Sequence, residues 1–215
     1  MQMEGSMSKK RKLWMLIIAV FVLVAIAVVL FLQFNKSTMR KYIIIQNELF
    51  YEDMAYVKMA ENLFAISLTD QIGITDRDQQ VYAIQGQDSN DWICVRIDGI
   101  EAVYRNSKIP YLVVDRFNTN KMVVKDESIL EGNQKTIIDQ TIIDASLGYM
   151  VDKNLVNMPE EGYSMVMAIN LYSDDFKGLC ITLYYLHDEN GNCFIYNSNT
   201  EEVWKIGHEL MQQLS

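Results

Sequence analysis

The side chains of this sequence that are best suited to acid–base chemistry are carboxylates that occur in adjacent pairs. A glycoside hydrolase needs two carboxyl groups facing each other across a cleft, one to donate a proton and one to act as base or nucleophile. Adjacent acids in turn-rich segments are also ordinary solvated residues, so spacing along the chain does not decide between these roles. The pairs considered as candidates are Glu160-Glu161, Asp174-Asp175, Asp188-Glu189 and Glu201-Glu202.

Histidine, cysteine and glycine patterns argue against the other common catalytic and metal-binding classes. His187 and His208 have no second His or Cys at metal-ligand spacing. Cys94, Cys180 and Cys193 form no C-x-x-C motif and fit small buried hydrophobic residues. The sequence contains neither a G-x-S-x-G nucleophile motif nor a glycine-rich phosphate loop. We therefore predict no catalytic residue, no metal site and no cofactor.

The charge balance predicts a basic protein partner rather than nucleic acid. The chain has 19 Lys and Arg against 28 Asp and Glu, a net charge of -9. Residues 1–36 hold five bases and one acid, which leaves -13 on residues 37–215. A surface this acidic repels phosphate groups and attracts basic proteins. Solubility alone is the other explanation for the same charge.

Tyrosines beside turn acids near the C-terminal end are candidate protein-recognition residues. A tyrosine ring buries apolar area at an interface while its hydroxyl group remains in water. In a strand, one of Tyr184 and Tyr185 must point inward, so packing on the covered face of a sheet is the alternative role. The predicted partner-binding residues are Asp174, Asp175, Tyr184, Asp188, Glu189 and Tyr196.

An unbroken apolar run, LWMLIIAVFVLVAIAVVLFL, occupies residues 13–32. As a helix it would be about 30 Å long, the thickness of a bilayer's hydrocarbon core. The basic residues directly before it, at positions 9–12, are typical of a cytoplasmic flank. The sequence predicts a basic cytoplasmic tail over 1–12, a transmembrane helix over 13–34 and an extracytoplasmic domain over 35–215. The protein would then be a single-pass cell-membrane protein.

A cleavable signal peptide is the alternative interpretation of this run. Ala25-Ile26-Ala27 resembles a cleavage site, and cleavage there would release a mature protein starting near Val28. Signal-peptide apolar regions are about 7–15 residues long, whereas this run continues to Leu32. The length therefore favours an uncleaved anchor.

The rest of the chain alternates helical and strand patterns. Apolar residues spaced three and four apart predict helices over 54–68, 139–151 and 203–214. Residues 179–186 and 193–196 predict an antiparallel hairpin. We expect an α+β fold, an antiparallel-sheet domain with helices packed on one face.

The segment Trp92–Arg105 predicts a second hairpin with a defined register. Asp98-Gly99 is a strong two-residue turn signal, and it places Arg96 opposite Glu101. The same register collects apolar residues such as Val95 on one face, and a slip of one residue would destroy this sorting.

These features together predict a membrane-anchored, non-enzymatic protein-binding domain. Two versions fit the sequence: an accessory or sensing module of an envelope complex, and an immunity-type protein that holds off a basic toxin domain. The alternative is a cell-envelope hydrolase using paired carboxylates. Acids that converge in one cleft would favour the hydrolase, and acids spread over a face would favour the binding domain.

Overall fold

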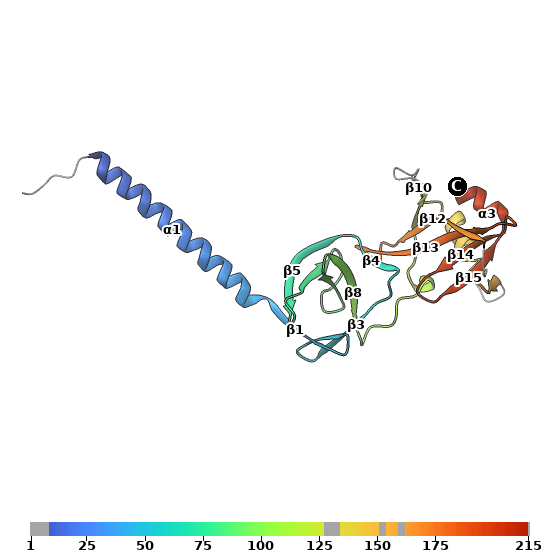
Figure 1. The fold of residues 1–215 in the computed structure, drawn as a ribbon, viewed down its shortest axis with the longest axis horizontal. Coiled ribbons are helices and arrows are strands. Elements are labelled where there is room, and N and C mark those ends of the chain that lie inside the picture. Colours follow the sequence, from blue (N-terminus) through green and yellow to red (C-terminus); the bar gives the residue numbers. More distant parts are fainter. Residues whose placement is uncertain (1–8, 127–133, 151–153, 159–161, 215) are drawn as a thin grey trace, which may run out of the picture. The chain divides into compact units, whose positions relative to one another are not determined.

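The structure is a computed structural model that describes residues 9–126, 134–150, 154–158 and 162–214. By its internal contacts the chain forms two units, Met1–Arg40 and Lys41–Ser215. In the first unit, α1 (Lys9–Thr38) is one continuous helix (Figure 1).

Helix α1 contains the apolar run of the sequence. Among the described residues, no helix has both the length and the apolar character needed to cross a membrane. This finding overturns three predictions: the transmembrane helix over 13–34, the single-pass topology, and the cell-membrane location with a cytoplasmic N-terminus.

Seven strands of the chain close into a barrel (Figure 1). Their order around the barrel is β1-β2-β3-β8-β7-β6-β5, and the described pairings are antiparallel. Tyr42, Tyr56 and Val95 belong to the buried cluster of the barrel. The strands are β1 (Arg40–Ile45), β2 (Glu48–Tyr51), β3 (Met54–Lys58), β5 (Leu68–Thr75), β6 (Gln80–Ile84), β7 (Trp92–Ile97) and β8 (Ile100–Asn106).

The predicted hairpin at Trp92–Arg105 is confirmed, with its register, as β7 and β8. Asp98 and Gly99 both have positive φ, 51° and 85°, as a tight two-residue hairpin turn requires. Val95 is fully buried inside the barrel. On the other face, the Arg96 guanidinium lies 2.5 Å from a Glu101 carboxylate oxygen.

A second antiparallel sheet follows the barrel in the chain. Its strand order is β10-β9-β12-β13-β14-β15-β11, and β4 pairs with β13 beside this path. Two short helices and one 3-10 turn accompany it: α2 (Gln140–Leu147), α3 (His208–Leu214) and η1 (Val114–Arg116). The strands are β4 (Leu63–Ala65), β9 (Lys121–Asp126), β10 (Gln134–Ile137), β11 (Leu155–Val156), β12 (Tyr163–Tyr172), β13 (Leu179–Asp188), β14 (Cys193–Asn197) and β15 (Glu202–Ile206).

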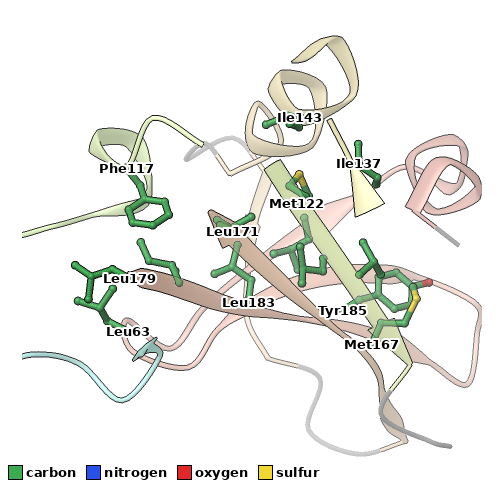
Figure 2. Close-up of a cluster of buried hydrophobic side chains, with 14 of the residues drawn as sticks. Leu63, Phe117, Met122, Ile137, Ile143, Met167, Leu171, Leu179, Leu183 and Tyr185 are labelled. Atoms are coloured by element: carbon green, nitrogen blue, oxygen red, sulfur yellow. The ribbon is translucent and has the colours of Figure 1, made fainter. Parts of the chain in front are cut away.

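The main hydrophobic core lies on one face of this sheet. Ile143 of α2 and Ile137 of β10 point toward Met122 and Leu171 of the sheet (Figure 2). Residues that leave the barrel, such as Leu63, belong to the same buried cluster. One core therefore joins the sheet to the segments that line the candidate site.

The predicted α+β class is wrong, because strands dominate the described residues and the helices beyond α1 are short. The predicted helix over 54–68 is instead β3, a turn and β4. Tyr56 faces the barrel interior while Leu63 packs in the sheet core. The pairing partners, β8 and β13, lie far away in sequence, so tertiary pairing overrides the local helical spacing.

The other two predicted helices form only in part. Helix α2 is shorter than the predicted 139–151, and the Asp139 side chain caps it by accepting from the Thr141 N–H; residue 151 lies outside the described residues. In the predicted helix over 203–214, β15 takes the first residues and α3 begins at His208. Val203 and Trp204 are both buried, in different clusters, because this strand is covered on both faces. The hairpin predicted at 179–196 is confirmed by the β13–β14 pairing.

Candidate functional site

The structure does not bring the predicted partner-binding acids together. Asp174 and Asp175 lie in the turn before β13, and Asp188 and Glu189 lie at its far end. A ten-residue strand separates these turns, which is about 30 Å at 3.4 Å per residue. The two turns therefore lie at opposite ends of β13, and their joint role in partner binding stays a prediction.

Asp188 organises its own turn. Its Oδ1 accepts hydrogen bonds from the backbone N–H groups of Asn190 (2.9 Å) and Asn192 (2.7 Å). Its Oδ2 accepts from the Asn192 side-chain amide at 2.6 Å. The Asn192 side chain is the main reason that the pKa of Asp188 lies below its usual value. This carboxylate is therefore largely occupied by structural hydrogen bonds.

Tyr184 and Tyr196 are half-buried cross-strand neighbours, with ring centroids 6.5 Å apart. They pack against a small cluster that includes buried Leu186. Tyr185 points to the opposite face, and its hydroxyl lies 2.9 Å from the Cys193 sulfur (Figure 2). The predicted alternation is confirmed.

The three cysteines are free and buried, as their strand positions predict. Burial raises the pKa of the Cys94 thiol to about 12 and that of Cys180 to about 11. Both thiols stay protonated at neutral pH, so neither acts as a nucleophile or thiolate ligand. No group of three or more His, Cys, Asp or Glu side chains is placed to hold a metal ion within the described part of the chain.

A pocket of about 280 Å³ lies where three distant segments meet. They are the link between β3 and β4, the loop before η1, and the turn between β14 and β15. Its lining surface is about half polar and half apolar, and the polar groups come from a few positions. The lining residues used below are Met59, Asn62, Leu63, Tyr111, Asp115, Ile181, Asn197, Asn199, Thr200, Glu202 and Trp204.

Two asparagines in this pocket, Asn62 and Asn197, form what we call the asparagine pair. Each is 5% exposed, and the Asn62 Nδ2 donates to Asn197 Oδ1 at 2.9 Å. β13 holds Asn62 in place, because the Thr182 N–H donates to the Asn62 carbonyl. Asn197 ends β14 and pairs with Glu202 across the turn. The pair therefore fastens two distant segments together beneath the pocket.

The hydrogen bonds fix the orientation of both side-chain amides. The Asn199 backbone N–H, which can only donate, lies 3.0 Å from Asn197 Oδ1. Asn62 must then present its NH₂ to that oxygen, which turns its own Oδ1 away. Asn62 Oδ1 accepts no hydrogen bond from any described residue. It is also not among the buried side-chain atoms that lack both a hydrogen-bond partner and contact with solvent. This atom therefore keeps some solvent contact, and Asn62 is one of the residues that line the pocket.

The outer part of the pocket, which we call the rim, is polar and negatively charged. It consists of Tyr111, Asp115, Asn199, Thr200 and Glu202. The Asn199 side-chain amide donates to the Tyr111 hydroxyl at 3.0 Å, and the Thr200 hydroxyl donates to a Glu202 carboxylate oxygen at 2.5 Å. The lining residues include two acids and neither lysine nor arginine.

Of the predicted carboxylate pairs, only Glu201-Glu202 contributes to the pocket, through one member. Glu202 lines it, while Glu201 is exposed in the turn with a positive φ of 58°. Glu160-Glu161 lies outside the described residues. The second acid of the pocket, Asp115, comes from another loop, so adjacency in sequence does not identify this pair.

The asparagine pair is the part of the site that sequence reasoning missed. Its members are 135 residues apart, and each stands where asparagine is an ordinary turn residue. No spacing signal links them, because only the pairing of β4 and β14 with β13 brings them together.

No protein-family model matches the chain, and comparisons with curated proteins and with solved structures give no match either. Function is therefore argued from the geometry of the pocket.

Proposed function

We propose that residues 41–215 form a non-catalytic protein-binding domain whose recognition site is the pocket and its rim. The observation that carries this proposal is the buried Asn62 side chain, which lines the pocket and whose Oδ1 accepts no hydrogen bond from the described residues. Pockets with apolar walls and a few convergent polar groups are the usual form of a binding site. A bound group that donates to Asn62 Oδ1 would complete its hydrogen bonding.

The net charge of -13 on residues 37–215 supports a basic partner. An accessory or sensing role and an immunity-type role both remain compatible with such a partner. In either case, association should be steered by charge and should slow as salt rises.

A carboxylate hydrolase is the second candidate, because Asp115 and Glu202 both line the pocket. A catalytic general acid needs a carboxyl group held in an environment that keeps its proton, as burial among apolar groups does. Asp115 is exposed, and the Glu202 carboxylate accepts a hydrogen bond from Thr200. This arrangement suits binding better than proton transfer.

The test is selection of displayed random 12-residue peptides on the immobilised full chain. We expect selected peptides to compete for one saturable site, and Tyr111→Ala and Glu202→Gln at the rim to weaken their binding. Glu189→Gln, in the turn at the far end of β13 from the pocket residue Ile181, is the matched surface control. Peptides that bind both rim variants as tightly as the unaltered chain would contradict the proposal. Hydrolysis of glycoside or ester substrates that is lost in Asp115→Asn would establish the hydrolase instead.

A further inference from the structure

We infer that the pocket accepts the guanidinium group of an arginine side chain presented by a protein partner. The inference rests on the proposed function and specifies the chemical group that is recognised. Three properties of the pocket carry it: its hydrogen-bond acceptors, its walls and its charge.

The free acceptors of the pocket match a group that only donates. Guanidinium has five N–H donors in a fixed plane and no acceptor. Asn62 Oδ1 supplies one acceptor from a side chain that is 95% buried, and the Glu202 carboxylate at the rim supplies more. A carboxylate and a planar guanidinium can form two parallel hydrogen bonds, which a lysine ammonium cannot reproduce.

The walls of the pocket suit the rest of the arginine side chain. Met59, Leu63 and Ile181 provide aliphatic surface for a methylene stem. Trp204 provides an aromatic surface, on which guanidinium packs more readily than a strongly hydrated ammonium group. A pocket of about 280 Å³ is just below the range for complete drug-sized ligands, so it fits one inserted side chain.

The charge of the pocket favours a cation. Asp115 and Glu202 both line it, and no basic residue does. A cation of the chain itself lies beside the rim, because the guanidinium carbon of Arg105 is 5.7 Å from the centre of the Tyr111 ring. Of these three charged side chains, Asp115, Glu202 and Arg105, two are negative, so attraction to a second guanidinium remains.

The test is an NMR titration of the full chain with Nα-acetyl-arginine amide. The chain has three tryptophans, so the indole N–H of Trp204 can be assigned by substitution, and it reports on the pocket together with the side-chain amides of Asn62 and Asn197. We expect saturable shifts of these signals in the millimolar range. The citrulline analogue of this probe has nearly the same shape but no charge. The lysine analogue has a positive charge but lacks the planar arrangement of N–H donors. Both should bind at least fivefold more weakly.

The substitution Glu202→Gln tests the same inference by changing the protein instead of the ligand. We expect at least a fivefold loss of arginine-amide affinity in this variant, with other amide signals unchanged because the fold is intact. Glu189→Gln removes one charge in the turn at the far end of β13 from the pocket residue Ile181, and it should leave the affinity within twofold of the unaltered chain. Equal losses in both variants would show that the probe responds only to total charge and would overturn the inference.

The remaining outcomes separate the inference from the proposed function. Citrulline binding as strong as arginine binding, or no saturable shift at Trp204, would overturn the guanidinium assignment. Selected peptides that bind the rim but lack arginine would do the same while leaving the protein-binding function standing. Arginine amide binding without any peptide binding would instead support a small-molecule site and overturn the protein-binding function.

Discussion

The pocket and the turn at Asp188 differ in how fully their polar side chains are hydrogen-bonded within the protein. In the turn, three donors from Asn190 and Asn192 occupy the Asp188 carboxylate. In the pocket, the Asn62 amide makes one bond to Asn197 and leaves an acceptor open. The contrast separates polar side chains that hold the fold from those that are available to a ligand, since buried polar groups are normally satisfied.

The same contrast applies to charge. The acids of the turns are numerous and account for the sequence-based partner prediction, yet they are dispersed along β13. The pocket has only Asp115 and Glu202, but they lie at one site together with the buried Asn62 side chain. Local geometry therefore has more weight than the number of acids.

The largest effect on stability is expected in the barrel interior. Val95→Asp would place an unpaired charge at a fully buried position of β7, at a cost of about 4 kcal/mol or more of unfolding free energy. Chemical denaturation of the full chain measures this. Glu101→Gln, on the other face of the same hairpin, is the control and should change stability much less. Equal losses would show that the burial of the two faces is wrongly assigned.

Asn197→Ala should have the next largest effect. It removes the oxygen that accepts from both Asn62 Nδ2 and the Asn199 N–H, which leaves two donors without a partner and should cost about 2 kcal/mol. Asn62→Ala removes one donor and also the open acceptor, so its cost should be clearly smaller. Denaturation curves of the two variants decide this, and the reverse order would contradict the orientation of the asparagine pair.

Asp188→Asn should lower the melting temperature only at higher pH. The pKa of Asp188 is lowered in the folded chain, so the stabilisation is fully present above its unfolded pKa of about 3.9. It is lost as pH falls through the lower folded value. Melting temperatures of both proteins from pH 7 to pH 2.5 should converge at the acid end. A difference that persists there would mean that the carboxylate charge is not what stabilises the turn.

The smallest effect on stability is expected for Glu202→Gln. Glutamine retains an oxygen that can accept from Thr200, so unfolding free energy should change by no more than about 0.5 kcal/mol. Stability should thus remain while arginine affinity falls, which is the pattern of a residue that serves binding. A large loss of stability would assign Glu202 to the turn and not to recognition.

Local signals predict the parts of this fold whose partners are close in sequence. The Asp98-Gly99 turn fixes the β7–β8 register, and Asp139 marks the start of α2. Residues 54–68 show the limit, because their helical spacing is equally compatible with two strands whose partners are β8 and β13. The pocket could not be predicted from the sequence for the same reason, because Asn62 and Asn197 meet only after long-range strand pairing is complete.

The measurement that most directly separates the pocket from the acidic turns compares two double variants of the full chain. Asp115→Asn with Glu202→Gln removes two negative charges at the pocket, and Asp98→Asn with Glu189→Gln removes two from exposed turns that do not line it. Net charge therefore changes by the same amount in both variants. Affinity for a labelled six-arginine peptide is measured for both at about 0.15 M salt, where the Debye length is about 8 Å. We expect the pocket variant to bind at least tenfold more weakly and the turn variant to stay within threefold of the unaltered chain. Equal losses, or a larger loss in the turn variant, would contradict recognition by the pocket.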